Sequence, residues 1–506
     1  MDIALTGSTG PGGETNESRP VSSAEAEPDP RRWSILIIVA IAQLMVVLDA
    51  SIVTIALPSA QRALHISVAN RQWVITAYTL AFGGLLLLGG RIADFGGRRR
   101  MFILGLIGFA AASALGGAAV DQIMLFSSRA LQGAFAALMA PAALSILTIT
   151  FQHDAGERAK AFGAYGAVSG AGAAIGALAG GLLTEYASWR WCLLINVPIA
   201  LLAALAASRV IGESRASGTT RYDIPGALLS TAGLVSLVYG FTKAVTDGWS
   251  SAPSLTLIAV GVILLAAFVV VEARSASPLL PLRVVLERNR GGSYLAALLN
   301  VVGLFAMFIF LSYYMQQILH YSAAKAGVAF LPFAVGVIVA AGASTLLLPK
   351  VGPRVAITVG LFTSSLGLLW LTQIGVHTSY WTHLFPQQIV MSLGLGLAFP
   401  ALSSTALTKV RERDAGVASA MVNTTQQVGA SLGAALLNTI AATATANYIA
   451  SHGPRLAPNA VVHGFTVAFA VGAIIVAAGA IASAVLINAK TKDLSNPAAS
   501  PAFGEA

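Results

Sequence analysis

Fourteen apolar stretches of membrane-spanning length divide this chain, and they restrict the folds open to it more than any other feature. Turn residues or charged clusters separate the stretches from one another. They cover residues 34–57, 72–92, 101–120, 123–147, 161–184, 190–208, 224–243, 254–272, 294–317, 326–348, 355–374, 383–406, 416–440 and 463–487. A transmembrane helix needs about 20 predominantly apolar residues. The sequence therefore predicts an all-α integral membrane protein with fourteen transmembrane helices.

The composition excludes the soluble classes of protein. Only 10% of the 506 residues are charged and 56% are hydrophobic, whereas soluble domains carry about 25% charged residues. Cys192 is the only cysteine, which excludes an intrachain disulfide and a cysteine-based metal site. Neither a phosphate-binding Gly-x4-Gly-Lys-Ser/Thr loop nor a His-Glu-x-x-His motif occurs. We therefore expect no metal and no cofactor, and an ion gradient as the source of energy.

The placement of Lys and Arg predicts the orientation. If the N-terminus is cytoplasmic, 23 of the 30 basic residues fall on that side and six on the outer side, as the positive-inside rule requires. Both termini are then cytoplasmic. The net charge of +9 reflects this topology, so no nucleic-acid partner is implied. Residues 1–30 contain no apolar run and are expected to be a disordered tail without a cleavable signal.

A weak internal repeat suggests two halves. A shift of 257 residues places Gly172 and Gly176 over Gly429 and Gly433, although chance similarity is common in helices rich in Ala and Gly. Parallel halves with a site between them are a transporter arrangement. The predicted organisation is a cytoplasmic tail at 1–33, a six-helix half at 34–208, a linker with two extra helices at 209–290, a second six-helix half at 291–487 and a cytoplasmic tail at 488–506.

Two charged residues lie inside predicted spans. Asp49 is 15 residues beyond Ser34 and so about 22 Å deep, and Arg129 is six residues into a span that enters from outside and so about 9 Å deep. Both depths fall in the outer half of the membrane. Charge within a span is costly and marks function by default, so we predict that Asp49 takes up protons or recognises cations, with Arg129 and Gln132 beside it. The alternative is a static salt bridge that only joins two helices.

The loop after the second span combines glycines with one acidic residue, Asp94, and a cluster of arginines. Glycines permit a tight turn, and the acid can pair with an arginine. The plainer alternative is a basic loop that only sets topology. The predicted gating residues are Gly90, Asp94, Gly97, Arg98 and Arg99.

Three further groups of residues are candidates for a role in transport. Small residues let helices pack closely or slide, and the fifth span has such a ridge at Gly166, Gly170, Gly172, Gly176, Gly180 and Gly181. Aromatic and amide side chains on two later spans are candidates for a substrate cavity, although at helical spacing such residues also face lipid or the core. These are Phe305, Phe308, Tyr313, Gln317, Asn423 and Gln427.

Together, these motifs resemble those of the major facilitator superfamily, in particular its fourteen-helix drug:proton antiporter branch (EmrB/QacA-type multidrug exporters). The similarity rests on residues 48–58, the loop from Gly90 to Arg99, residues 129–133, the glycines from Gly166 to Gly181 and residues 189–198, and it extends over residues 33–490. The resemblance implies two six-helix halves that rock around a central cavity. It also implies that Asp49 takes part in proton coupling or cation recognition, that Arg129 assists proton transfer, and that the loop controls an inward gate. Thr54, Phe95, Ala173 and Ala177 depart from that pattern, which puts tight coupling in doubt.

The favoured hypothesis is proton-driven export of lipophilic compounds such as antibiotics or dyes. Asp49 is the only acid placed deep in a span, so neutral or monocationic substrates are expected rather than dications. Apart from the lipid bilayer, protons and these substrates, no partner is implied, and a monomer is the expectation. One alternative is a dedicated exporter of a single metabolite or self-made antibiotic. A channel or a membrane enzyme is a remote one, since neither a filter sequence nor a cluster of catalytic residues is present.

Overall fold

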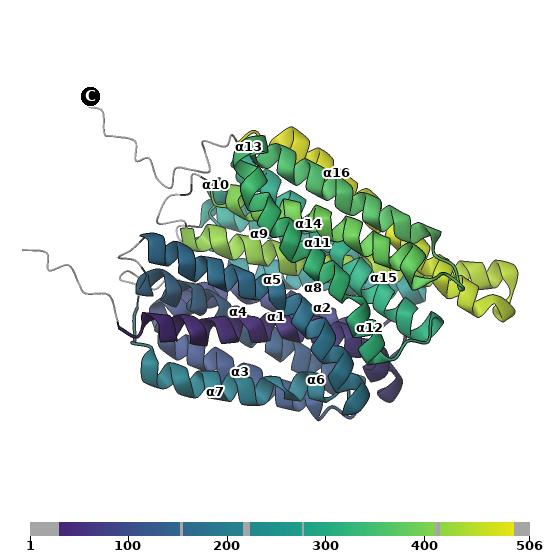
Figure 1. The fold of residues 1–506 in the computed structure, drawn as a ribbon, viewed down its shortest axis with the longest axis horizontal. Coiled ribbons are helices and arrows are strands. Elements are labelled where there is room, and N and C mark those ends of the chain that lie inside the picture. The colour runs from purple at the N-terminus through teal and green to yellow at the C-terminus, as the bar shows by residue number, and fades with distance from the viewer. Residues whose placement is uncertain are drawn as a thin grey trace, which may run out of the picture.

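The protein is an assembly of long helices, and no strand occurs in the part of the chain that the structure describes (Figure 1). This computed structural model describes residues 30–489 except 152–154, 216–222, 276–277, 409 and 411–414. Inside the helices and turns it also leaves out of the description the side chains at 87, 155–156, 158–159, 162–163, 166–167, 169–171, 173–174, 415–416, 419 and 454. The first group of helices comprises α1 (Arg32–Ala63), α2 (Trp73–Gly96), α3 (Arg98–Gly117), α4 (Gln122–Thr150), α5 (Ala155–Tyr186), α6 (Trp191–Leu194) and α7 (Asn196–Val210). A central hairpin follows, made of α8 (Ile224–Asp247) and α9 (Ala252–Arg274).

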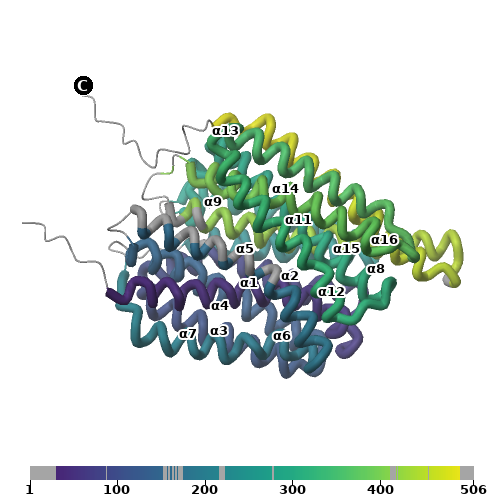
Figure 2. The backbone as a smooth tube through the Cα atoms, viewed as in Figure 1, coloured from purple at the N-terminus to yellow at the C-terminus, as the bar shows by residue number. Residues whose placement is uncertain are grey.

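The second group of helices occupies the rest of the described chain. It comprises α10 (Leu282–Val285), α11 (Arg288–Tyr313), α12 (Ala323–Ala329), α13 (Leu331–Trp370), α14 (Phe385–Ala406), α15 (Ala415–His452) and α16 (Ala457–Leu486). Short π-helical turns extend α11 at its end and precede α14. The chain path in Figure 2 shows the first group below and the second group above in that view.

Eleven helical segments of the described chain are long and apolar enough to cross a membrane, or twelve when the bent helix α2 is included. The sequence predicts fourteen. Part of the difference lies at residues 323–373, which count once although two spans are expected there. Within this segment Gly352 has a φ of 76°, a left-handed conformation that breaks the helical geometry of α13. Helix α5 has residues outside the described set and is not among those counted.

Helix α5 packs along α1, and the described part of its glycine ridge makes this contact possible. Gly172 faces Val47 of α1, and Gly176 faces Ser51. A Cβ added at Gly180 would lie 2.9 Å from the Cα of Ile52, so the two backbones touch where only glycine fits.

Not all glycines of the predicted ridge on α5 face α1. Gly181 faces the second group of helices, where an added Cβ would lie 2.9 Å from the Cα of Ala324 in α12. Gly166, Gly170 and the substituted position Ala173 lie outside the described residues. The ridge therefore serves one contact inside the first group and one between the two groups.

The corresponding glycines of the second group make the equivalent contact. Gly429 and Gly433 of α15 face Leu298 and Val302 of α11. Helix α15 thus packs on α11 as α5 packs on α1, each on the first long helix of its group. The 257-residue shift therefore relates two similar helix pairs in space.

The contact at Gly180 leads to a prediction about stability. Gly180→Ala should lower the free energy of unfolding by about 1–3 kcal/mol, because the new methyl group meets backbone atoms that cannot move aside. Gly342→Ala is the matched control, since an added Cβ there meets nothing within 4 Å and alanine favours a helix over glycine. Thermal unfolding of the purified variants measures both changes. Equal melting temperatures for the two variants would contradict the packing argument.

The two groups of helices meet along α2 and α15 and where α12 lies on α5, while α8 contacts both α2 and α15. Helix α1 begins and α16 ends at one end of the long axis, here called the termini end; the opposite end is the far end (Figure 1). At the far end the hairpin of α15 and α16 projects beyond the other helices.

Candidate functional site

Asp49 lies in the middle of the first helix group with no exposed surface, and its carboxylate is bound by three side chains. Oδ2 is 2.5 Å from Nη1 of Arg129 on α4, so the pair expected from sequence depth is in direct contact. Oδ1 accepts hydrogen bonds from Gln132 at 3.1 Å and from Asn196 at 2.8 Å. Helices α1, α4 and α7 therefore converge on one charge.

Arg129 is also bound on its other sides. Its Nε donates to the carbonyl oxygen of Val74 at 2.9 Å and its Nη1 to Oε1 of Gln132 at 2.8 Å. The guanidinium lies over the ring of Tyr78, 4.5 Å from the centroid, an arrangement that stabilises a cation. Helix α2 is thus held to the same site through the arginine.

Sequence reasoning missed three members of this network. Asn196 falls in the stretch 189–198 that carries the family resemblance, but an asparagine near the start of a span gives no signal of its own. Ser113 of α3 accepts from Gln132 at 2.7 Å, and Tyr78 of α2 contributes its ring. All three are neutral, and neutral side chains are common in membrane helices, so only the fold reveals their place.

The chemistry of the site follows from these partners. The ion pair and the two amide donors stabilise the negative charge of Asp49 in a dry environment. If a proton reached the carboxylate, the attraction between opposite charges would be lost, and Arg129 would have only neutral partners: the protonated acid, Gln132, the Val74 carbonyl and the Tyr78 ring. The arrangement can therefore convert a change of protonation into a change in how α1 is held against α4 and α7.

The predicted gating loop lies at the termini end, between α2 and α3. Asp94 pairs with Arg98 at 2.8 Å, and Gly97 turns the chain with a φ of 107°. Glu213 was not foreseen: its Oε1 accepts from the backbone of Arg99 at 3.3 Å and would lie 2.7 Å from a Cβ at Gly97. The loop is therefore docked on the segment that follows α7.

The other loop residues make contacts in keeping with this docking. The Arg99 side chain donates to the carbonyl oxygen of Ser208 at 2.6 Å, and Gly90 faces Pro141 of α4. Arg91 donates to the carbonyl oxygen of Pro278 at 3.2 Å, which joins the end of α2 to the chain after the central hairpin.

The six candidate cavity residues lie in separate places. Phe308 packs on Phe330 and Phe333 with ring centroids 5.1 and 5.3 Å away, and Phe305 packs beside the same core. Tyr313 is buried at the far end and donates to Gln61 of α1. Gln317 is exposed.

The two candidates on α15 are half-buried. The Gln427 Cβ lies 2.9 Å from where a Cβ on Gly83 of α2 would be, so this residue sits at the contact between the two groups of helices. Asn423 is one turn closer to the start of α15. Their role in binding substrate stays a prediction.

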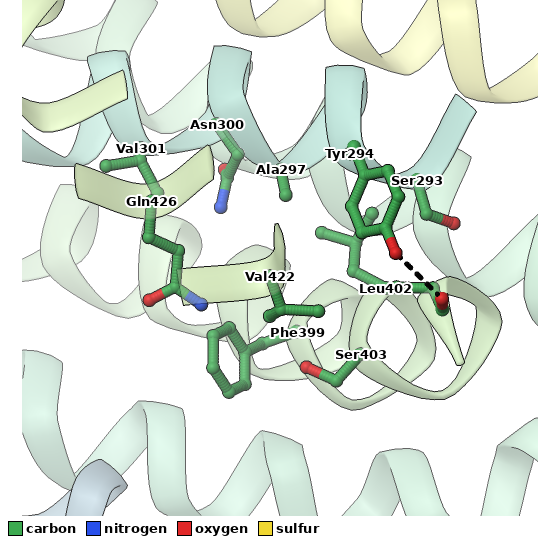
Figure 3. A pocket seen from close by; sticks show the side chains of 11 residues that line it. Ser293, Tyr294, Ala297, Asn300, Val301, Phe399, Leu402, Ser403, Val422 and Gln426 are labelled. Carbon is green, nitrogen blue, oxygen red and sulfur yellow. Dashed lines mark hydrogen bonds between the residues drawn. The ribbon is translucent and has the colours of Figure 1, made fainter. Parts of the chain in front are cut away.

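A small cavity of about 20 Å³ lies next to this face of α15. Figure 3 shows the amides of Asn300 and Gln426 and the ring of Phe399 at its wall. Tyr294 is turned toward α14, where its hydroxyl donates to the carbonyl oxygen of Ala406 at 3.2 Å. A volume of this size holds about one water molecule. The cavity combines neutral hydrogen-bonding groups with apolar walls.

No three His, Cys, Asp or Glu side chains of the described residues are placed to hold a metal ion. Cys192 is buried, with its Sγ 3.3 Å from the hydroxyl of Thr184. The candidate site consists of the ion pair and the hydrogen bonds around Asp49.

The family model of the Major Facilitator Superfamily matches residues 39–434. This chain belongs to the major facilitator superfamily. Its match spans the Asp49 site, the central hairpin and most of the second helix group. The protein is accordingly a multi-pass membrane transporter, and the site around Asp49 is a site in a transporter.

Two curated superfamily relatives are similar over most of their length. The puromycin resistance protein of Streptomyces alboniger is 51% identical over 483 residues, which cover 94% of this chain and 95% of the relative. The cephamycin export protein of Amycolatopsis lactamdurans is 40% identical over 424 residues, covering 82% of this chain and 87% of the relative.

A solved transporter structure shares the fold. It is a bacterial homologue of the human lysosomal transporter Spinster in an inward-facing and occupied conformation, with a TM-score of 0.68 and 15% identity. The match covers 93% of this chain and 99% of that one. At this identity the likeness concerns the fold alone.

Proposed function

We propose that this protein is a proton-driven exporter of lipophilic small molecules that works by alternating access. The observation that carries the proposal is the buried Asp49–Arg129 ion pair, 2.5 Å long, in a member of a transporter superfamily. A charge buried among helices is costly unless it is paired. Relatives named for antibiotic resistance and export support the outward direction of transport.

Asp49 is the proposed proton carrier, and Arg129 and Gln132 are its proposed partners. In the described state the carboxyl group is buried and bound by three donors. When the helices part and water reaches it, Asp49 takes up a proton and the ion pair is lost. Its return to the bound state releases the proton. Substrate and proton then use the same site at different steps of the cycle.

The gating role of the α2–α3 loop and the sliding contact of α5 on α1 are proposed from where these segments lie in the fold. The loop with Gly90, Asp94, Gly97, Arg98 and Arg99 controls opening at the termini end, and its docking on Glu213 supports this role. The small face of α5 lets α1 shift during the cycle. Phe95 and Ala177 stand where the branch has other residues, so coupling in this chain rests on the Asp94–Arg98 pair and on the described glycines.

The proposed topology has fourteen spans, with both termini in the cytoplasm of a bacterium and the chain in its plasma membrane. The left-handed Gly352 inside α13, the 32 residues of α5 and the distribution of Lys and Arg support it. The proposed halves are residues 34–208 and 291–487, joined by the linker at 209–290. Both halves belong to one chain, which supports a monomer as the working unit.

A dedicated antibiotic exporter is a second candidate within the same transport class. The names of the relatives favour it, because each refers to one antibiotic, puromycin or cephamycin. Puromycin is therefore the first compound to test, beside the broad-range monocationic dye ethidium.

Proton flux in proteoliposomes that contain a pH-sensitive dye tests the proposal. We expect puromycin to cause proton movement in the direction opposite to its own. Movement of puromycin but not of ethidium would favour the dedicated exporter. Transport without any proton movement would exclude proton coupling and assign Asp49 to substrate recognition.

The charge of the substrate is tested in the same vesicles. One buried acid balances one positive charge, so ethidium should move faster than the dication propidium. Equal rates for the monocation and the dication would refute this expectation.

A further inference from the structure

One asparagine of α15 makes three side-chain hydrogen bonds, all of them to the other group of helices. The Oδ1 of Asn438 accepts from Nε of Arg71 at 2.7 Å. Its Nδ2 donates to Oε1 of Gln72 at 2.6 Å and to the carbonyl oxygen of Val68 at 3.2 Å. These three partners lie on the turn between α1 and α2, at the far end. Asn438 is 1% exposed, so water does not compete for these bonds.

The central hairpin joins the same contact. The Nε2 of Gln72 donates a hydrogen bond to the hydroxyl of Thr242 on α8 at 3.1 Å. Beside Asn438, the hydroxyl of Thr439 donates to the carbonyl oxygen of Phe241 at 2.9 Å. The turn 64–72, α8 and α15 thus meet at one cluster, here called the Asn438 cluster, which consists of Arg71, Gln72, Thr242 and Asn438.

Further bonds between the two groups of helices lie near this cluster. Ser312 donates to the carbonyl oxygen of Thr54 at 3.4 Å, and Gln316 donates to that of Ile55 at 3.1 Å. At the termini end, Arg91 binds the carbonyl oxygen of Pro278. At the far end, the Asn438 cluster and the bonds from Ser312 and Gln316 hold the two groups of helices together in this state.

Arg71 makes this closure unusual. Its side chain is buried, and it lies over the ring of Tyr313, 4.4 Å from the centroid. No described carboxylate lies within ion-pair distance of it, in contrast to Arg129 with Asp49. An aromatic face and an amide compensate only part of the cost of removing a cation from water. Opening the far end would rehydrate this cation, and that gain offsets the hydrogen bonds that break.

We propose that Asn438 is a positioning residue of the transport cycle, which closes the far end through neutral hydrogen bonds, and that its neutrality is what allows the far end to open again. A carboxylate in its place would form a buried ion pair with Arg71, and breaking such a pair is costly. This inference assigns the central hairpin a part in the closure through Thr242. The inference depends on the transport function proposed above in one respect: it requires that the far end opens during transport.

Two substitutions of nearly the same shape test it in opposite directions. Asn438→Asp adds the missing charge, and Gln72 can turn its amide to donate to the new carboxylate. The bond to the Val68 carbonyl is lost in this variant, because a carboxylate has no donor, and the new ion pair with Arg71 must outweigh that loss. Asn438→Leu removes all three bonds and leaves the Nε of Arg71 and the Oε1 of Gln72 without their partner in the closed state. The distance between the groups is read by spin labels on Cys at Ala63 and Ala446, which are exposed on α1 and α15, in a Cys192→Ser background.

The two variants are expected to shift the equilibrium between the open and closed far end in opposite directions. Asn438→Leu should raise the ratio of molecules with the open distance to molecules with the closed distance about tenfold. A change of about 1.4 kcal/mol in the free energy between the two states produces this effect. Asn438→Asp should lower this ratio and stop transport without lowering the melting temperature, which separates a locked protein from a misfolded one. Asn459→Asp, a matched change at an exposed position of α16, should leave both distances and transport unchanged.

The proposal is overturned if Asn438→Leu has the distances of the parent, or if Asn438→Asp transports like the parent. If Asn438→Asp does not fold, the Asn438→Leu distances decide alone. The distances are measured without substrate or gradient. A failure of proton-coupled flux in the parent would therefore refute the proposed function and leave this test of the closure intact.

Discussion

Asp49→Asn is expected to abolish the proton movement that accompanies substrate, by about 100-fold or more, while the protein still folds. Asparagine has the shape of aspartate but cannot take up a proton, and removal of a proton-transferring group has effects of this size. The new amide can still accept from Asn196 or Gln132, and Arg129 keeps its bond to the Val74 carbonyl. Fluorescence of a pH-sensitive dye trapped in proteoliposomes measures the loss.

Asp247→Asn is the matched control for this experiment. Asp247 is a partly exposed acid at the end of α8 that pairs with Lys243 at 3.7 Å, and a surface pair of this kind contributes little. Its substitution should leave the proton flux unchanged. Undiminished coupled flux in Asp49→Asn would instead identify the Asp49–Arg129 pair as a static link between helices.

Arg129→Leu is expected to lower the free energy of unfolding by about 3–5 kcal/mol, because it leaves the buried carboxylate of Asp49 without its cation. The two amide donors from Gln132 and Asn196 remain but carry no full charge. Addition of Asp49→Asn in the same chain should recover most of the loss, since it removes the unpaired charge. Thermal unfolding of the single and double variants measures the two effects.

Arg62→Leu is the control for a lost arginine, since Arg62 is exposed and bonds only to Ser59 among the described residues. It should change the melting temperature little. If the double variant is as unstable as Arg129→Leu alone, the loss comes from packing around the arginine and not from the charge of Asp49.

The sequence predicts the centre of the site because charge is rare in a membrane span. Depth along two helices was enough to bring Asp49 and Arg129 together, and helical spacing added Gln132. Asn196, Ser113 and Tyr78 were not predicted, because a neutral polar side chain costs little in a helix and carries no signal until its partner is known. Glu213 was not predicted for a different reason. It lies after α7, more than 100 residues along the chain from the backbone of Arg99 that it binds.

The fold class and the pairing of similar helices follow from apolar length and from the glycine repeat. The cavity candidates were less informative, because the 3.6-residue period places an aromatic side chain on a face without saying what that face meets. Tyr313 illustrates this: its ring covers a buried arginine of the other helix group. Gly352 shows that the break between two expected spans is short, since a single residue with a φ of 76° interrupts the helical geometry of α13.

The projecting hairpin of α15 and α16 offers a handle for imaging. At 1.5 Å per residue, the 38 residues of α15 extend about 57 Å, against a hydrocarbon core of about 30 Å. Gly453, at the bend, has a φ of 84° and nothing within 4 Å of an added Cβ. An epitope inserted there would stand clear of the helical body, so a rigid antibody fragment could add the mass and asymmetry that particle alignment in electron cryomicroscopy needs.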